Sequence, residues 1–133
     1  MSIPYSVSDA ICRVRNALNV KHLTTNVKYS RLVWNVLDVM VKEGWLEKIE
    51  LLSTGEVQKE IKVFLKYDTE QVSVISDLNI KSKPSKREYV AKAEIPKVQS
   101  GFGTCILSTS KGILSGKSAR LQNVGGELLL EVS

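Results

Sequence analysis

Residues 108–120 read STSKGILSGKSAR, and the division of this stretch into strand, loop and helix decides how the second half of the chain folds. The apolar run before it predicts a buried strand at residues 104–109. Gly112 follows Lys111 directly and disfavours a helix at that point. Ser115 is a plausible N-cap for a short helix, which would contain Lys117, Ala119, Arg120 and Leu121.

The segments on either side of this stretch resemble strands and turns. Residues 72–75 and Ile80 predict strands, and residues 82–89 (SKPSKREY) predict a cationic turn. Gly125 and Gly126 predict a tight turn, after which ELLLEV forms a closing strand. The second half is therefore expected to be mostly β, with one short helix.

Two amphipathic helices are expected in the first half. Ser6 is a plausible N-cap of the first helix, and Ser30 is a plausible N-cap of the second, which Gly44 would end. The first helix carries one apolar stripe, formed by Val7, Ala10, Ile11, Val14, Ala17 and Leu18. The predicted strands lie at residues 24–29, 45–51 and 61–67, with a turn at Thr54–Gly55 between the last two.

The order of these elements predicts an α+β chain of two small subdomains. The first half reads α-β-α-β-β, which is typical of a small sheet covered by two helices. The polar residues 68–71 (DTEQ) resemble a linker. We therefore predict an N-terminal α/β subdomain over residues 1–67 and a mostly β subdomain over residues 72–133.

Composition argues against several classes of protein. The 133 residues are 43% apolar and 25% charged, which is typical of a soluble globular chain. No apolar run reaches the roughly 18 residues of a membrane span, and the first residues do not resemble a secretory signal. His22 is the single histidine and is expected in a loop, whereas Cys12 and Cys105 are expected to be buried thiols. We expect no metal site and no cofactor.

Charge is concentrated in one part of the sequence. The chain carries a net charge of +5, yet residues 1–80 hold ten basic and ten acidic side chains. Residues 81–120 hold nine basic side chains against Glu88 and Glu94. Such a local excess favours a polyanionic partner. The alternative is a solvated basic face that keeps the protein soluble.

Two catalytic interpretations of residues 108–120 are weak. Ser108 and Lys111 fit the S-x-x-K pattern of serine acyl-enzymes, but that motif begins a helix and comes with S-D-N and K-T-G partners that this chain lacks. Residues 112–118 (GILSGKS) are one residue shorter than a phosphate-binding P-loop, whose backbone must close around a phosphate. We therefore expect no catalytic residue.

A third interpretation is recognition of RNA. The hydroxyls of residues 108–110 can meet 2′-OH groups and base edges, and Lys111 can meet a phosphate. Gly112 lets a backbone approach closely, and Tyr89 can stack on a base. The residues alone leave a plain hydrophilic turn, or a basic face that binds an acidic protein, as open alternatives.

Several short motifs resemble the small-subunit ribosomal protein eight family of the bacterial and organellar type. They occur in that family's order along nearly the whole chain: RVRNA (13–17), KEGWL (42–46), LKY (65–67), IPKV (95–98), GFG (101–103), STSKG (108–112) and GGE (125–127). STSKG together with the late GGE is the most specific part of the resemblance.

The resemblance implies a non-catalytic structural constituent of the small ribosomal subunit that binds small-subunit ribosomal RNA and supports assembly. It places the main RNA grip in the second half and implies neighbouring ribosomal proteins as further partners, without a membrane or a small-molecule substrate. The expected location is the ribosome, in a bacterial cytoplasm or in the matrix or stroma of an organelle. The implied contacts of the main grip are Ser108, Thr109, Ser110, Lys111, Gly112, Lys86, Arg87, Tyr89 and Glu127, while Arg13, Arg15 and Asn16 would meet a second RNA segment.

Overall fold

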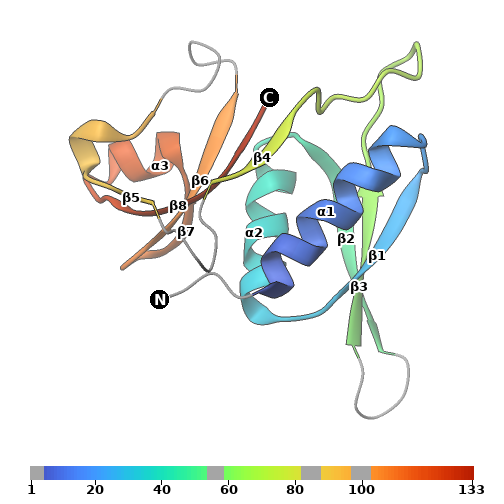
Figure 1. Cartoon of the computed structure of the whole chain (residues 1–133), viewed down its shortest axis with the longest axis horizontal. Helices are drawn as coiled ribbons and strands as arrows, with labels where there is room; N and C mark the ends of the chain where they lie inside the picture. Colours follow the sequence, from blue (N-terminus) through green and yellow to red (C-terminus); the bar gives the residue numbers. More distant parts are fainter. Residues whose placement is uncertain (1–4, 54–58, 82–87, 97–102) are drawn as a thin grey trace. The chain divides into compact units, whose positions relative to one another are not determined.

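The computed structural model describes residues 5–53, 59–81, 88–96 and 103–133. The chain divides into two compact units, Tyr5–Ile75 and Ser76–Ser133 (Figure 1). The predicted α+β class is confirmed, because the described residues combine α-helices with two antiparallel sheets.

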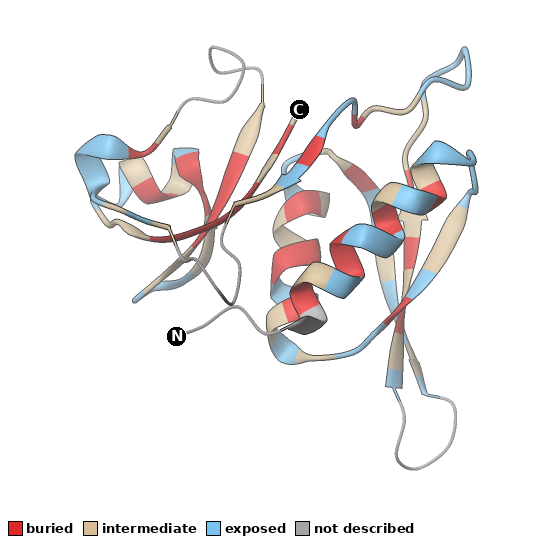
Figure 2. Ribbon diagram, viewed as in Figure 1, coloured by how far each residue is buried: buried red, intermediate tan, exposed pale blue. Residues whose placement is uncertain are grey.

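The first unit has the predicted order α-β-α-β-β. Its elements are α1 (Tyr5–Asn19), β1 (Thr24–Lys28), α2 (Arg31–Lys42), β2 (Leu46–Ser53) and β3 (Lys59–Leu65). The strands form an antiparallel sheet in the order β1-β3-β2. Alternate residues of β3, Ile61, Val63 and Leu65, are buried, as the period of a half-buried strand requires. The apolar stripe of α1 is buried apart from the half-buried Leu18, and one side of α2 is buried as well (Figure 2).

Local signals set the ends of α2 as predicted. The Ser30 hydroxyl accepts a hydrogen bond from the Val33 N–H at 3.1 Å, which caps the first turn. Gly44 has a φ of +87° just after the helix, a conformation that glycine adopts without steric cost. The predicted cap of α1 is wrong, because α1 begins at Tyr5 and Ser6 therefore lies within its first turn.

The second unit is mostly β, as predicted. The elements are β4 (Leu78–Ile80), β5 (Tyr89–Val90), the 3-10 turn η1 (Lys92–Glu94), β6 (Thr104–Thr109), β7 (Gly112–Ser115), α3 (Gly116–Leu121) and β8 (Gly126–Val132). The sheet has the strand order β4-β8-β6-β7, and β5 also pairs with β8. A core cluster joins α3 to the sheet through Ala119, Leu107 and Leu128.

Some predicted elements differ from the structure. Residues 72–75 form no strand, since a single bridge from Ser73 to Tyr67 is their only β pairing. The segment 68–71 is a turn in which the Asp68 carboxylate accepts hydrogen bonds from the N–H groups of Glu70 and Val72. The predicted turn at Thr54–Gly55 and residues 82–87 lie outside the described residues.

The two cysteines behave differently, and only one matches the prediction. Cys105 is buried, but Cys12 is exposed because it lies off the apolar stripe of α1. His22 lies in a loop and is exposed, as predicted.

Candidate nucleic-acid interface

The STSKG segment forms the tip of a β-hairpin. Thr109 pairs with Gly112, so Ser110 and Lys111 form a two-residue turn between β6 and β7, and both are exposed. The predicted strand at residues 104–109 is confirmed as β6, but the strand β7 was not predicted. The signal was present, since the short apolar runs 105–107 and 113–114 are separated by five residues that include a glycine.

Glycine and threonine hold this turn in place. The favoured two-residue hairpin turns need a positive φ at their first position, yet neither Ser110 nor Lys111 has one. Gly112 supplies the positive φ, at +106°, directly after the turn. The Thr109 hydroxyl donates to the Gly112 carbonyl oxygen at 2.8 Å and accepts from the Lys111 N–H at 3.1 Å. Thr109 therefore fixes the position of Lys111.

A row of polar side chains crosses the sheet beside the turn. Tyr89 of β5 is in register with Glu127 of β8, and Glu127 is in register with Ser108 of β6. Residues directly opposite each other in antiparallel strands project from the same face. The structure thus brings together three residues that are far apart in the sequence.

The members of this row differ sharply in exposure. Tyr89 is 62% exposed, whereas Glu127 is only 3% exposed. Within the described part of the chain, the Glu127 Oε2 atom is buried without a hydrogen-bond partner. A buried acceptor without a partner costs free energy, so this oxygen is suited to a donor from a bound molecule.

Gly125 and Gly126 serve close packing, which corrects their predicted role as a tight turn. Gly126 begins β8, and a methyl group at this position would overlap the Ser108 carbonyl oxygen. A methyl group at Gly125 would overlap the Val90 carbonyl oxygen. The chain turns earlier, where Asn123 has a φ of +56°.

The helix that follows the hairpin is anchored from both sides. The Ser115 hydroxyl accepts from the Ser118 N–H at 3.2 Å, which confirms the predicted cap. Arg120 donates to the carbonyl oxygens of Ile95 and Pro96 at 3.3 and 3.4 Å. Arg120 therefore stabilises the fold, while Lys117 is exposed.

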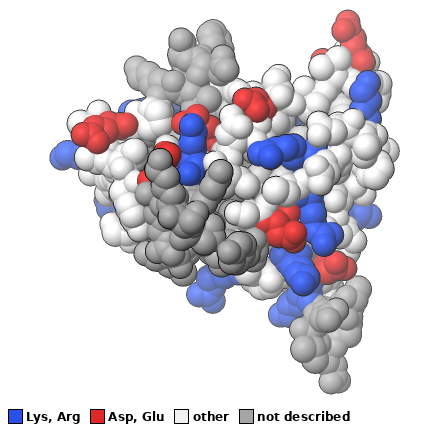
Figure 3. Space-filling model, viewed as in Figure 1, with Lys and Arg blue, Asp and Glu red and all other residues white. Residues whose placement is uncertain are grey.

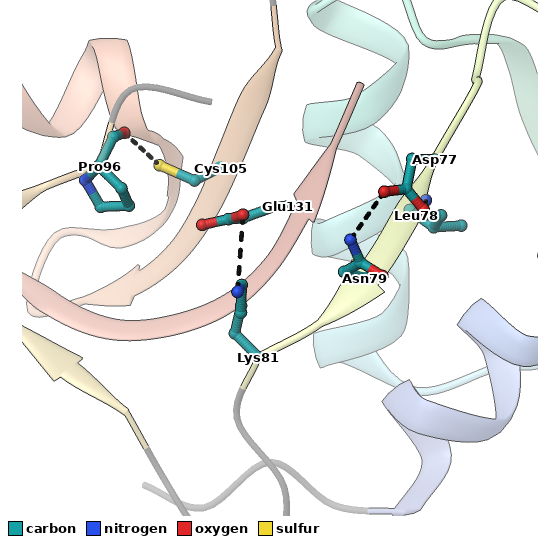
Figure 4. A network of polar contacts seen from close by, with 7 residues as sticks. All are labelled: Asp77, Leu78, Asn79, Lys81, Pro96, Cys105 and Glu131. Atoms are coloured by element: carbon teal, nitrogen blue, oxygen red, sulfur yellow. Dashed lines mark hydrogen bonds and ion pairs between the residues drawn. The ribbon is translucent and has the colours of Figure 1, made fainter. Parts of the chain in front are cut away.

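A buried thiol lies beneath this helix. The Cys105 Sγ–H donates to the Pro96 carbonyl oxygen at 3.6 Å (Figure 4). Burial raises the pKa of the Cys105 thiol above its ordinary value, and the positive charge of Arg120 opposes this only in part. A methyl group at Gly116 would overlap the Cys105 sulfur, so the helix approaches β6 closely.

The basic side chains of the second unit fall into two groups. Lys81 forms an ion pair with Glu131 at 3.8 Å (Figure 4), so its charge is partly balanced. Lys111 and Lys117 form no ion pair among the described residues. The predicted contacts Lys86 and Arg87 lie outside the described residues.

The predicted contacts on the first unit lie along α1. Arg13 and Asn16 are exposed and Arg15 is half-buried. Arg13 forms an ion pair with Asp9 one turn earlier, at 3.2 Å. On the face drawn in Figure 3, basic and acidic side chains of the described residues are interspersed.

The geometry gives the catalytic interpretations little support. Ser108 and Lys111 lie on a strand end and a turn, whereas the S-x-x-K motif of acyl-enzymes begins a helix. In the ranges that the structure describes, no three His, Cys, Asp or Glu side chains gather as metal ligands. None of the helices described there combines the length and apolar composition of a membrane span.

Comparison with known proteins identifies the family. The family model named Ribosomal protein S8 matches residues 6–133. The small ribosomal subunit protein uS8 of Dictyoglomus thermophilum is 43% identical over 133 residues, which cover 99% of each chain. The protein of the same name from Acetivibrio thermocellus is 41% identical over 92% of each chain, and that from Enterococcus faecalis is 39% identical over 95% of each. This chain belongs to the ribosomal protein S8 family.

Proposed function

We propose that this protein is a structural constituent of the small ribosomal subunit that binds small-subunit ribosomal RNA directly and catalyses no reaction. The family match supports the first part. The observation that carries the RNA-binding part is the row of Tyr89, Glu127 and Ser108, which lies beside the exposed turn of Ser110 and Lys111.

Each residue of this region has a distinct role in the proposal. Lys111 neutralises a phosphate, and the hydroxyls of Ser108 and Ser110 bond to 2′-OH groups or base edges. Tyr89 stacks on a base or sugar. Thr109 and Gly112 hold the turn. Lys86 and Arg87, which lie outside the described residues, are proposed as further RNA contacts.

Glu127 fills a role that the basic residues cannot. An ionised carboxylate only accepts hydrogen bonds, and it repels phosphates. Since its Oε2 atom is buried without a partner in the described chain, the proposal assigns it an N–H or O–H donor of the RNA. Glu127 would then contribute to discrimination between RNAs more than to general affinity.

The first unit is proposed to meet a second RNA segment through Arg13, Arg15 and Asn16 on α1. We propose that the two RNA contacts belong to separate subdomains. These are an α/β subdomain (1–67) and an RNA-binding subdomain (72–133), joined by a linker (68–71). Neighbouring small-subunit proteins are further partners of the assembled particle.

A double substitution tests the main RNA contact at the hairpin turn. Ser110→Ala with Lys111→Ala should weaken binding to the small-subunit RNA of the same organism, measured by filter binding at several salt concentrations. The loss of Lys111 should make the salt slope shallower by about one. Unchanged affinity together with an unchanged slope would contradict this placement of the contact.

Two further measurements separate the proposal from its rivals. Sedimentation with the small ribosomal subunit is expected, and release of the protein by ribonuclease distinguishes RNA from an acidic protein as the partner. Labelling of Ser108 by a serine-directed acylating probe, lost in Lys111→Ala, would instead favour an enzyme.

A further inference from the structure

A second cluster of aromatic and basic side chains lies on the first unit, where β1 ends and α2 begins. We propose that Tyr29, together with Lys59 beside its ring and the exposed cations Lys28 and Arg31 close to it in sequence, binds an unpaired nucleotide of the small-subunit RNA. The base stacks on the Tyr29 ring, and the adjacent phosphates lie against the three cations. This inference rests on the proposed function and adds a contact that is separate from α1 and from the STSKG hairpin.

The aromatic part of the cluster is held in a fixed position. The rings of Tyr29 and Trp34 have centroids 6.5 Å apart and planes inclined by 51°. Tyr29 is 38% exposed, whereas Trp34 is half-buried on the first turns of α2. The Tyr29 N–H also donates to the Lys59 carbonyl oxygen at 3.1 Å. Because the ring is already ordered, stacking a base on it costs little additional conformational entropy.

The second part of the cluster consists of three exposed cations. The Lys59 Nζ atom lies 5.9 Å from the Tyr29 ring centroid, and Lys28 and Arg31 are exposed. In the described chain none of these three forms an ion pair. Glu60 is in register with Lys28, yet no ion pair joins them.

Other cations of the same unit provide a contrast. Lys42 pairs with Asp38 at 3.0 Å, and Lys48 pairs with Glu50 at 3.1 Å. The first turn of α2 also contains no acidic residue, so the positive end of the helix adds to the field of the cluster. The start of α2 therefore combines an exposed aromatic ring with exposed cations that form no ion pair in the described chain.

The chemistry of the cluster favours a nucleotide over an acidic protein segment. An exposed aromatic ring bordered by cations is how proteins bind unpaired nucleotides, since every base has a face that stacks and every nucleotide has a phosphate. An acidic peptide would use the cations but would leave the Tyr29 ring without a planar partner.

The ring is tested by paired substitutions in the full-length protein. Tyr29→Leu keeps an apolar side chain against Trp34 but removes the aromatic face, and Tyr29→Phe keeps that face. Binding to full-length small-subunit RNA should weaken about fivefold or more for Tyr29→Leu, in line with the stacking energy of one base. Tyr29→Phe should bind like the unchanged protein.

The cations are tested separately, which covers the case that Tyr29→Leu does not fold. Arg31→Ala with Lys59→Ala should make the salt slope shallower by about one to two. Lys42→Ala is a control for position, because it removes a positive charge from the same helix as Arg31 but away from the cluster. Its slope should remain unchanged.

Chemical footprinting of the RNA locates the contact. One or a few nucleotides should lose protection with Tyr29→Leu and keep it with Tyr29→Phe, while the footprint of the second unit persists. A complete footprint with Tyr29→Leu would overturn the inference and leave the proposed function intact. Absence of RNA binding by the unchanged protein would overturn both. A photo-crosslinking residue placed at position 29 provides a last test in the assembled subunit. Crosslinks to a neighbouring protein, and not to RNA, would overturn the inference about Tyr29.

Discussion

Cys12 and Cys105 show how one residue type acquires two chemistries from its surroundings. Cys12 is exposed on α1, whereas Cys105 is 2% exposed beneath α3. The thiolate is the reactive form of cysteine, and burial disfavours the charged thiolate of Cys105 by raising its pKa. The two thiols should therefore differ in reactivity towards the same reagent.

We expect the native protein to consume one equivalent of an aromatic disulfide reagent rapidly at pH 8, through Cys12. A second equivalent should react only after denaturation. Cys12→Ser should remove the rapid phase, and two rapid equivalents in the unchanged protein would contradict the burial of Cys105. The raised pKa also means that folded Cys105 keeps its proton at a pH where the unfolded chain loses it. The free energy of unfolding should therefore fall as the pH rises above the ordinary thiol value of about 8.5.

At the scale of elements, Gly44 after α2 and Gly126 at the start of β8 are needed for different structural reasons. Gly44 has a φ of +87° after α2, and a methyl group there would meet no atom within 4 Å. Gly126 has no such φ, but a methyl group there would overlap the Ser108 carbonyl oxygen. One glycine serves a backbone conformation and the other serves the spacing of two strands.

Substitution by alanine should separate these two roles. Gly44→Ala should lower the free energy of unfolding by about 1 kcal/mol, the cost of a left-handed residue. Gly126→Ala should lower it by about 3 kcal/mol, because the overlapping atom is backbone and must move. Urea denaturation measures both changes.

The Gly44→Ala and Gly126→Ala variants should also differ in their affinity for RNA. Gly126→Ala should also weaken RNA binding, since it displaces β6 beside Ser108, whereas Gly44→Ala should not. Equal losses of stability and of RNA affinity in the two variants would contradict this assignment.

The elements that the sequence predicted well have strong local signals. The stripe of α1, the Ser30 and Ser115 caps and the alternation of β3 depend on residues close together in the chain, and all are confirmed. The turn expected at Gly125–Gly126 was wrong because glycine signals both turns and close packing. Only the position of β6 beside β8 distinguishes these roles, and that contact joins residues far apart in sequence.

The candidate site was predictable in part for the same reason. The STSKG segment is continuous, so its hydroxyls and Lys111 could be named from the sequence. The row of Tyr89, Glu127 and Ser108 depends on the pairing of three strands, and Glu127 was named only through the family resemblance. Its buried, unpartnered Oε2 atom follows from packing, which no local pattern encodes.

Across the whole molecule, the distribution of charge matters more than its sum. The net charge is +5, but the described cations of residues 81–120 are unequal. Lys81 is paired with Glu131 and Arg120 bonds to backbone carbonyls. Lys92, Lys111 and Lys117 are exposed, and of these Lys111 lies at the hairpin tip. General attraction to a polyanion depends on total charge, whereas a specific contact depends on the position of each charge.

Two charge reversals that change the net charge equally distinguish general attraction to RNA from a specific contact. Lys111→Glu changes the exposed turn of the second unit, and Lys42→Glu changes an exposed residue at the end of α2. Lys42 takes part only in a surface ion pair with Asp38, so its loss should alter the free energy of unfolding by less than about 1 kcal/mol. Lys111→Glu should weaken binding to small-subunit RNA at least about tenfold and make the salt slope shallower by about one, because it replaces a phosphate contact by a repulsion. Lys42→Glu should change the affinity little, and equal losses in the two variants would show that net charge, and not the hairpin tip, governs binding.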